Sequence, residues 1–470
     1  MEELFILSGI RGPIDIFSTE LIETIAISYG LWLKKRDQNE VIVGCDTRPS
    51  SSRILDCVIR GLSKINCKIY DVGTCPSPVI IYTKNQRNIS GGIIITGSQK
   101  PPNINGLRFL SNITYVNDRE LREIHSIAQN LDYSKYNEKN GELTKNNKKI
   151  DAIPLYLEAL YSNIPLKKIR ENNNLTVVID TGAGTGTLIL PQLLRELGCD
   201  VKIINDQLIE DKEFPRALNL EEKNLKGLIK KVWEKEADLG LAYDINTHRL
   251  RIVGDDYKCY GKDVSLALIA DYYVNKGVNP CYLVTNIASS LRLDIIAQKY
   301  EIKIIKTAIG EFFLALKIDS LMRENPNAFI FGGEGSNGGV MIPEFNNTRD
   351  AIFATTKIIE QLTTKGGKIS SLVSEFPRYY KYREHIDIKG KDITVLINKI
   401  KEELHSEGEH VFQIGDDLRV DNKLENFVLI HPSTTESIIK VIAEARRKSL
   451  ARILGQTTAK LVRMIIKESE

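Results

Sequence analysis

One serine stands where an α/β protein usually keeps a reacting group. Ser98 lies in the segment TGSQKPP (residues 96–102), directly after the apolar run Gly92–Ile95. Such a run predicts a buried strand, and the two prolines force the chain that follows into an extended conformation. The pattern therefore presents one hydroxyl at the carboxyl end of a strand, where α/β sheets bind their ligands. A Ser/Gly turn without chemistry is the alternative, and this segment alone favours it.

The composition is that of a globular protein with several domains. The chain has 470 residues, of which 42% are hydrophobic and 27% charged. Its formal charge of only +3 gives no reason to expect nucleic acid or an anionic membrane as a partner. Seven cysteines without a CxxC pair suit reduced thiols, and the sequence has neither a signal-peptide pattern nor a membrane-spanning apolar run. We therefore expect a cytoplasmic protein.

A strand–turn–helix–strand pattern occurs three times along the chain. In each copy an apolar run is followed by a turn of polar or small residues, an amphipathic segment and a second apolar run. This order predicts a βαβ unit in a mainly parallel sheet. The paired strands are expected at Val41–Gly44 and Lys68–Val72, at Thr176–Asp180 and Val201–Ile204, and at Tyr282–Asn286 and Ile302–Ile305. The repetition indicates three related α/β domains.

Polar segments between these units predict the domain boundaries. Residues 132–149 carry few apolar side chains and should form a linker, and turns near 254–256 and 364–367 mark two more boundaries. We expect domains at 1–149, 150–255, 256–370 and 371–470. The last domain ends in a basic helix, whose apolar face should pack on its own domain rather than on a membrane. That face is expected to consist of Leu450, Ile453, Leu454, Leu461 and Ile465.

The glycines at positions 182, 184 and 186 raise the question of a nucleotide-binding turn. The dinucleotide pattern GxGxxG requires a third glycine at position 187, which is Thr here. We therefore expect a turn that packs a strand against a helix. A nucleotide-binding α/β protein is the weaker alternative.

Five segments, in order along the chain, resemble the signature loops of the α-D-phosphohexomutase superfamily, which includes phosphomannomutase/phosphoglucomutase and phosphoglucosamine mutase. They are SGIRG (8–12), TGSQKPPNINGLRF (96–109), DLGLAYDINTHRL (238–250), GEGSNGG (333–339) and HPSTTE (431–436), with weaker matches at GCDTRPSS (44–51) and TNIASSLRLD (285–294). The resemblance implies four domains around a central cleft, each contributing one loop. Three would be mixed-sheet α/β domains and the C-terminal one α+β.

The resemblance also implies an activity. Members of this superfamily move a phosphoryl group between C1 and C6 of a hexose through a phosphoserine and a bisphosphate intermediate. A phosphorylated hexose (mannose, glucose or glucosamine) is then the partner, and a hexose 1,6-bisphosphate the activator. Ser98 is expected to be the nucleophile, with Arg11 and Arg249 near its phosphate. The residues expected to bind the sugar and its far phosphate are Glu334, Ser336, Asn337, His431, Ser433, Thr435 and Lys440.

The metal loop departs from the family pattern. That pattern is Asp-Gly-Asp-x-Asp-Arg, whose three carboxylates hold Mg²⁺ together with the phosphoserine, here Ser98. The matching positions in this chain are Asp244, Asn246 and His248. Two negative charges are gone, so a hard cation should bind more weakly, and a histidine nitrogen suits Mn²⁺ or another borderline divalent ion better. Either the metal has changed or it has been lost.

The serine and phosphate loops depart from the pattern as well. The family's His-Asn after the serine is Gln99-Lys100, and its later lysine, a proton carrier, is Arg108, which is a poor general acid. Lys100 lies two residues from Ser98 and either neutralises a phosphate there or is solvated. His431 replaces an arginine of the phosphate loop, and Lys440 on the next strand restores some charge.

Two hypotheses follow from these matches and departures. The first is an active phosphohexomutase with altered metal use. The second is a catalytically impaired homologue that binds a phosphosugar or pairs with an active paralogue. The sequence leaves the oligomeric state open between a homodimer and such a hetero-oligomer.

Overall fold

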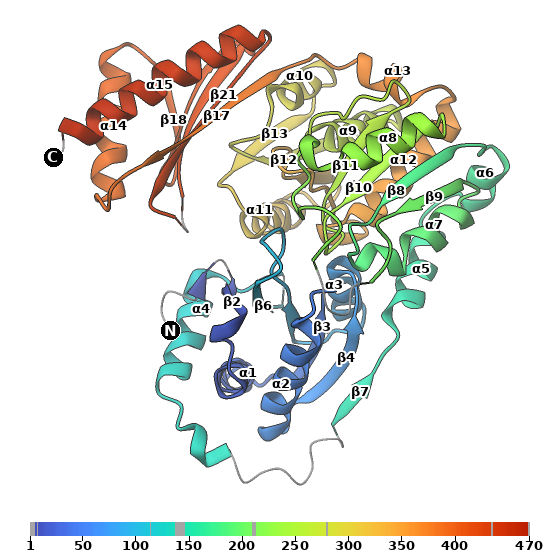
Figure 1. Ribbon diagram of the computed structural model, residues 1–470, viewed down its shortest axis with the longest axis vertical. Helices are drawn as coiled ribbons and strands as arrows, with labels where there is room; N and C mark the ends of the chain where they lie inside the picture. Colours follow the sequence, from blue (N-terminus) through green and yellow to red (C-terminus); the bar gives the residue numbers. More distant parts are fainter. Residues whose placement is uncertain are drawn as a thin grey trace. The chain divides into compact units, whose positions relative to one another are not determined.

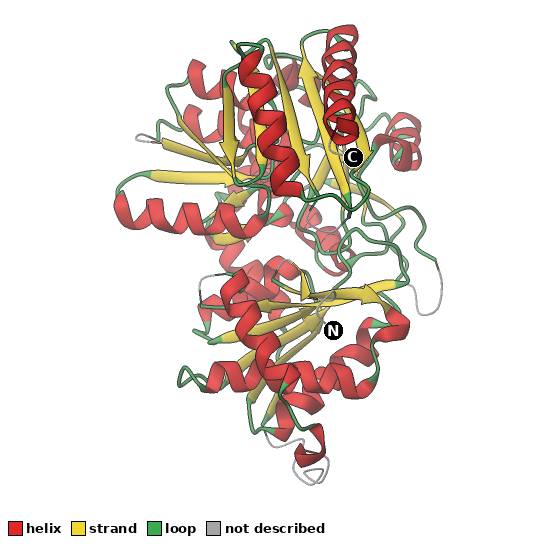
Figure 2. Ribbon diagram, turned by 90° about the vertical axis from the view of Figure 1, so that its left-hand side faces the viewer, coloured by secondary structure: helices red, strands yellow, loops and turns green. Residues whose placement is uncertain are grey.

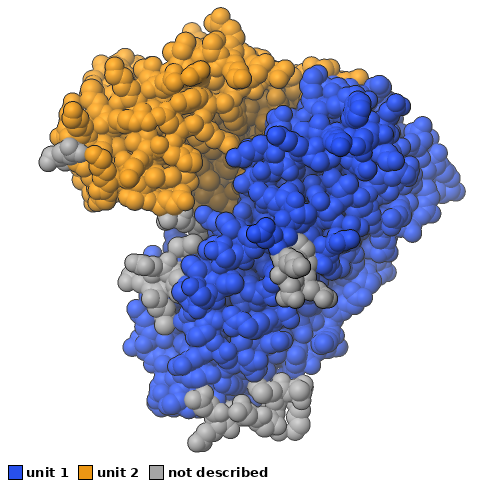
Figure 3. Space-filling model, in the orientation of Figure 1, with its two compact units in different colours: residues 1–261, 339–370 blue, residues 262–338, 371–470 orange. Residues whose placement is uncertain are grey.

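The structure is a computed structural model that describes residues 5–6, 8–112, 114–136, 146–208, 213–278, 281–433 and 436–468 (Figure 1). It divides into two compact units. Unit 1 is formed by residues 1–261 and 339–370, and unit 2 by residues 262–338 and 371–470 (Figure 3).

The first sheet of unit 1 and its helices are built from β1 (Phe5–Ile6), β2 (Gly9–Pro13), α1 (Thr19–Lys34), β3 (Glu40–Cys45), α2 (Ser51–Lys64), β4 (Lys68–Thr74), α3 (Ser77–Gln86), β5 (Gly91–Ile95), β6 (Ile104–Leu110), α4 (Asp118–Gln129) and β7 (Asn147–Lys149). The strand order is β1-β2-β6-β5-β3-β4-β7. Strands β3, β4 and β5 are parallel, whereas β6 runs antiparallel to β5 and β2.

Helices cover both faces of this sheet, which explains why its inner strands are apolar throughout (Figure 2). Helices α1, α2 and α4 share one core with alternate residues of β3 and β5. Helix α3 covers the other face, where Ile80 lies against the backbone of Gly44. Helix α4 begins with a capping box formed by Asn117 and Glu120.

The second sheet of unit 1 and the elements around it are α5 (Ala152–Ser162), α6 (Leu166–Glu171), β8 (Thr176–Asp180), α7 (Leu190–Glu196), β9 (Asp200–Ile204), α8 (Lys226–Glu234), β10 (Leu239–Tyr243), β11 (Leu250–Gly254), the hairpin β15 (Met341–Ile342) and β16 (Asn346–Arg349), and α12 (Ala351–Lys365). The sheet order is β11-β10-β8-β9, with β8 parallel to both neighbours. The turn from β10 to β11 is the metal loop named above.

Unit 2 consists of α9 (Val264–Asn275), β12 (Cys281–Asn286), α10 (Leu291–Lys299), β13 (Lys303–Thr307), α11 (Glu311–Glu324), β14 (Phe329–Gly333), α13 (Ile369–Ser374, which begins in unit 1), β17 (Tyr380–Asp387), α14 (Ile393–Ser406), β18 (Val411–Ile414), β19 (Asp417–Asn422), β20 (Asn426–Pro432), β21 (Ile438–Ala445) and α15 (Lys448–Glu468). Strands β13, β12 and β14 are parallel. The other sheet is antiparallel, in the order β17-β21-β20-β19-β18.

The antiparallel sheet has two different faces. Helices α14 and α15 pack on one face, against sheet residues such as Ile386, Leu418 and Ile439. The other face places Phe427 and Leu429 against the turn 287–291 that precedes α10. Burial on both faces applies to the inner strands β20 and β21, whereas the edge strands β17 and β18 are largely exposed or half-buried.

The three predicted βαβ units and the fourth, C-terminal sheet are confirmed. The predicted linker 132–149 contains β7 at its end, and residues 137–145 lie outside the described residues. Segment 339–370 joins unit 1. The prediction for the apolar face of α15 is wrong at Ile453, which is 59% exposed. Among the described helices, none is long and apolar enough to cross a membrane.

Two helical glycines test the packing of unit 1. A Cβ atom on Gly61 of α2 would lie 2.8 Å from the carbonyl oxygen of Glu23 and 2.9 Å from the Cβ of Ala26, both on α1. We expect Gly61→Ala to lower the free energy of unfolding by about 1–3 kcal/mol, because overpacking outweighs a gain of about 1 kcal/mol in helix propensity. Gly227→Ala in α8 is the matched control, since its Cβ would have only Ile204 Cδ1 nearby, at 4.0 Å. Urea denaturation should show that the free energy of unfolding falls in Gly61→Ala and rises in Gly227→Ala. A change of the same sign in both variants would contradict close packing of α1 on α2.

Candidate active site

Ser98 lies between β5 and β6 in the left-handed region of backbone space, with φ of 54°. Residues other than glycine rarely adopt this conformation, and it is stable only where the surroundings fix the backbone. The backbone N–H of Ser98 donates to the hydroxyl of Thr96 at 2.8 Å, and its side chain is partly exposed. The loop thus holds one serine in a strained and accessible position, which is typical of functional sites.

The guanidinium group of Arg48, in the loop between β3 and α2, fixes this backbone. It is buried and donates to four carbonyl oxygens of the serine loop: those of Ser98 (2.7 Å), Lys100 (2.7 Å), Pro101 (2.6 Å) and Ile104 (2.8 Å). Gly97 is required for this approach, because a Cβ atom there would lie 2.6 Å from the Arg48 Cζ atom. A loop without regular structure therefore has its carbonyl groups satisfied by one side chain.

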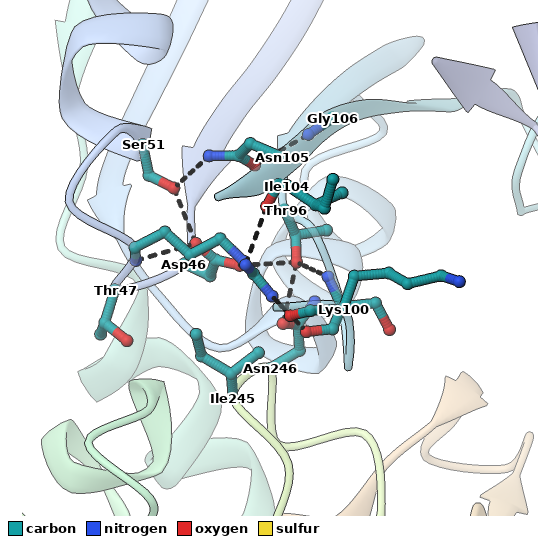
Figure 4. A network of polar contacts seen from close by, with 12 residues as sticks. Asp46, Thr47, Ser51, Thr96, Lys100, Ile104, Asn105, Gly106, Ile245 and Asn246 are labelled. Carbon is teal, nitrogen blue, oxygen red and sulfur yellow. Dashed lines mark hydrogen bonds and ion pairs between the residues drawn. The ribbon is translucent and has the colours of Figure 1, made fainter. Parts of the chain in front are cut away.

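Asp46 belongs to the same network of polar contacts (Figure 4). Its carboxylate accepts hydrogen bonds from the Arg48 backbone (3.0 Å) and from the hydroxyls of Ser51 and Thr96 (2.7 Å each), and it pairs with Arg48 Nε at 3.2 Å. The only sequence signal for these two residues is the weak match GCDTRPSS at 44–51, which predicts no functional role for either.

We call the hydrogen bonds of Arg48 to the serine loop, together with its ion pair to Asp46, the Arg48 clamp. This clamp predicts that removal of the Arg48 side chain strongly lowers the stability of the protein. Replacing Arg48 with Ala leaves the buried Asp46 carboxylate without its cation, so we expect the free energy of unfolding to fall by about 3–5 kcal/mol. Arg119→Ala is the control, because Arg119 is 84% exposed and forms only a surface ion pair with Glu123, worth less than about 1 kcal/mol. Chemical denaturation of both variants measures the difference, and similar midpoints would contradict the clamp.

Four arginines lie close enough to one another around the serine loop to interact electrostatically. Burial, followed by the charges of Arg108, Arg249 and Arg48, lowers the pKa of Arg11 to about 10. Arg11 on β2 pairs with Gly106 of β6, and Arg108, two residues further along β6, is its diagonal neighbour in the sheet. Like charges destabilise one another in such a cluster, and a bound anion would remove this cost.

The polar side chains of the metal loop are engaged in hydrogen bonds and an ion pair within the protein. One carboxylate oxygen of Asp244 accepts from the backbone N–H groups of His248 (2.8 Å) and Arg249 (3.0 Å), and the other pairs with the Arg249 guanidinium at 2.9 Å. The amide of Asn246 lies 3.0 Å from the hydroxyl of Thr96 and 3.2 Å from that of Ser77. Asp244, Asn246 and His248 are all buried.

This donor set does not fit a magnesium ion. Mg²⁺ requires near-octahedral oxygen ligands, in proteins mainly carboxylates. Only Asp244 supplies a carboxylate in this loop, and it already neutralises Arg249. Within the described parts of the chain, no group of three or more His, Cys, Asp or Glu side chains is arranged to hold a metal.

Unit 2 carries the predicted sugar loop at the end of β14. The carbonyl oxygen of Glu334 accepts from the N–H groups of Asn337 (2.8 Å) and Gly338 (3.0 Å), which closes a tight turn, and Glu334 is buried. The hydroxyl of Ser336 lies 3.4 Å from the amide of Asn286 at the end of β12. The turn is thus supported by the carboxyl end of the neighbouring parallel strand, as in other α/β sites.

The antiparallel sheet of unit 2 aligns basic residues across three strands. His385, Lys440 and His431 are in register on β17, β21 and β20. Asp417 of β19 contacts His431 Nδ1 at 2.6 Å, and the Lys440 ammonium lies 3.5 Å from the Ser433 hydroxyl. Of the predicted phosphate residues, His431, Ser433 and Lys440 therefore come together, whereas Thr435 lies outside the described residues.

Comparisons with known proteins agree with this arrangement of loops. Models of phosphoglucomutase/phosphomannomutase alpha/beta/alpha domains I, II and III match residues 2–135, 154–257 and 262–380. A phosphoglucomutase/phosphomannomutase of Thermococcus kodakarensis is 33% identical over 99% of this chain and 100% of its own length. The chain belongs to the phosphoglucomutase/phosphomannomutase family.

Further relatives of this family member agree with the assignment. A probable phosphoglucosamine mutase of Pyrococcus abyssi is 31% identical over the full length of both chains, 100% of each. A phosphoglucomutase/phosphomannomutase family protein of Burkholderia thailandensis superposes with a TM-score of 0.82 at 20% identity, covering 99% of this chain and 98% of the other. Phosphoglucomutase (parafusin) of Paramecium gives a TM-score of 0.77 at 18% identity, with 99% and 95% covered. The resemblance inferred from five loops is confirmed.

Within unit 1 of this family member, Arg108, Arg249 and Arg48 lie near Arg11, and Arg48 in turn binds the carbonyl oxygen of Ser98. Arg108 lies over the ring of Tyr115 at 3.5 Å. Lys100 is exposed, and its side chain extends away from the hydrogen-bond network (Figure 4). The arrangement favours a solvated Lys100, whereas Arg48 and Arg249 are held near the serine loop by ion pairs with Asp46 and Asp244.

The glycine turn at 182–186 is a packing turn, as expected. A Cβ atom on Gly184 would lie 2.7 Å from the Cα of Ile245 in the metal loop. The carbonyl oxygen of Ala183 accepts from the Thr47 hydroxyl at 2.7 Å. The turn therefore joins the metal loop to the loop that carries Arg48.

Proposed function

We propose that this protein is a phosphohexomutase that interconverts the 1-phosphate and the 6-phosphate of a hexose through a phosphoserine at Ser98. The observation that carries the proposal is the cluster of four guanidinium groups around a serine in strained backbone conformation. A phosphoserine carries nearly two negative charges and three acceptor oxygens, which guanidinium groups bind in pairs.

The chemistry needs few further groups. A hexose hydroxyl attacks the phosphorus of phosphoserine 98, the bond from phosphorus to the Ser98 oxygen breaks, and a hexose bisphosphate forms. The proton lost by the sugar hydroxyl is the one that the Ser98 oxygen regains. In a loose transition state, charge accumulates on the equatorial phosphoryl oxygens, where Arg11 and Arg249 stabilise it. The reverse transfer from the other phosphate of the bisphosphate restores phosphoserine 98 and releases the isomeric monophosphate.

Unit 2, taken by itself, carries groups suited to binding a sugar phosphate. The buried carboxylate of Glu334 is an acceptor for sugar hydroxyls, and Ser336 and Asn337 lie in the same turn. His431, Ser433 and Lys440 offer positive charge and a hydroxyl to a phosphate group. His385, in register with Lys440, is an additional candidate for this role that the sequence did not identify.

The names of the relatives limit the sugars to test. They are phosphoglucomutase/phosphomannomutase and probable phosphoglucosamine mutase, so we propose glucose, mannose or glucosamine phosphates as substrates and a hexose 1,6-bisphosphate as activator. We also propose a cytoplasmic location, on the basis of seven cysteines scattered without a CxxC pair. A homologue that binds sugar phosphates without turnover has no specific observation in its favour.

Phosphorus NMR of the purified protein with each hexose phosphate and a bisphosphate tests the proposal. The wild type should interconvert 1- and 6-phosphates, and Ser98→Ala should lose at least about 10⁴-fold in rate because the acceptor oxygen is missing. Ser126→Ala, on the exposed surface of α4, is the control and should leave the rate unchanged. A Ser98→Ala variant with wild-type rate, or a wild type inactive on all three sugars, would overturn the proposed function.

A further inference from the structure

We infer that this mutase needs no divalent cation: arginines hold the phosphate on Ser98, and Asn246 is a structural tie between two loops rather than a metal ligand. The inference rests on the proposed function of Ser98. It follows from the hydrogen bonds at Asn246 and from the charges around the serine loop.

The first step concerns the hydroxyl of Thr96. This group has one proton to donate and two lone pairs. Its neighbours are the Asp46 carboxylate (2.7 Å), the Ser98 N–H (2.8 Å) and the Asn246 amide (3.0 Å). The carboxylate can only accept, so it takes the proton, and the Ser98 N–H occupies one lone pair. The remaining lone pair needs a donor, which is the amide nitrogen of Asn246.

The second step concerns the other end of that amide. The oxygen and nitrogen of an asparagine side chain are assigned from their hydrogen bonds. With the nitrogen toward Thr96, the oxygen accepts from the Ser77 hydroxyl, 3.2 Å away. The Thr96 hydroxyl and the Asn246 amide oxygen are then both satisfied, and that oxygen is directed to Ser77 of α3. An aspartate at position 246 would set two carboxylates against one proton, so this network selects an amide.

The third step concerns charge. Asp46 pairs with Arg48 and Asp244 with Arg249, and the guanidinium groups of Arg48, Arg108 and Arg249 all lie near that of Arg11. A loop with three carboxylates needs a divalent ion to bind a phosphate dianion. Here two of those carboxylates are replaced, and Arg11 and Arg108 bring positive charge on the rigid strands β2 and β6. Guanidinium groups bind phosphate oxygens bidentately and require no metal.

Metal removal tests the inference directly. The wild type is dialysed against EDTA, treated with glucose 1,6-bisphosphate and assayed by phosphorus NMR with EDTA, Mg²⁺ or Mn²⁺. We expect the three rates to agree within about twofold, which corresponds to a difference in activation free energy too small to indicate a catalytic metal. Loss of more than tenfold in EDTA that a divalent ion restores would overturn the inference.

Binding of Mn²⁺ provides a readout that does not depend on turnover. Electron paramagnetic resonance of Mn²⁺ added to the full chain, before and after bisphosphate treatment, should show no site tighter than about 1 mM. One stoichiometric site of micromolar affinity would overturn the inference. If no sugar is converted under any condition, the proposed function fails, while this titration still decides for or against a metal site.

Three variants separate a structural tie from a ligand. Asn246→Asp should lower the midpoint of thermal unfolding and leave the rate insensitive to Mg²⁺, whereas Asn422→Asp, on the exposed end of β19, should leave the midpoint unchanged. Arg11→Gln should lower the rate by about 10²–10³-fold with or without Mg²⁺. An Asn246→Asp protein of unchanged stability that gains Mg²⁺-dependent rate would show that position 246 is a ligand position.

Discussion

The buried fork of Arg48 is the interaction on which the proposed site depends. The serine loop has no regular structure of its own, and four of its carbonyl oxygens would lack partners without this side chain. A planar guanidinium group can serve all four at once because its donors have fixed directions. Asp46 neutralises the buried charge of Arg48 and also accepts a hydrogen bond from the Thr96 hydroxyl. The same two side chains therefore fix the conformation of the serine loop and compensate each other's charge.

The same network extends to the metal loop through Thr96. In this chain, the contact of Asn246 with Thr96 ties β10–β11 to the serine loop by hydrogen bonds instead of by charge. Asp244 is used within its own loop to hold the Arg249 guanidinium and two backbone N–H groups. A divergent metal loop therefore remains an ordered element that positions an arginine.

Sequence alone predicted the elements whose signal is local. The strands β8 and β12 follow from apolar runs, and the glycine turn at 182 follows from its spacing. The role of Arg48 was missed because its partners lie 50 to 56 residues away, and that of Asn246 because Thr96 lies 150 residues away. The outer face of α15 was misjudged for a related reason.

On α15 the buried stripe contains small residues as well as large ones: Ala451, Gly455 and Ala459 are buried together with Val462, Ile465 and Ile466. A Cβ atom on Gly455 would lie 2.1 Å from Tyr382 Cδ1, so the sheet approaches the helix along its small residues, and Ile453 is left exposed. Helical periodicity predicts which face of a helix is apolar. It does not predict at which positions of that face a neighbouring side chain, here Tyr382, leaves room only for a small residue. The functional loops show the same limit, since types and spacing indicated phosphate chemistry and three-dimensional contacts determine how it is held.

A crystal structure of the protein phosphorylated on Ser98, grown with Mn²⁺ and measured near the manganese absorption edge, tests the central claim most directly. The account predicts guanidinium nitrogens of Arg11 and Arg249 within hydrogen-bond distance of the phosphate, Asn246 bonded to Thr96 and Ser77, and no anomalous peak beside Asp244. An anomalous peak bridging Asp244 and the phosphate, with Asn246 turned toward it, would contradict the account.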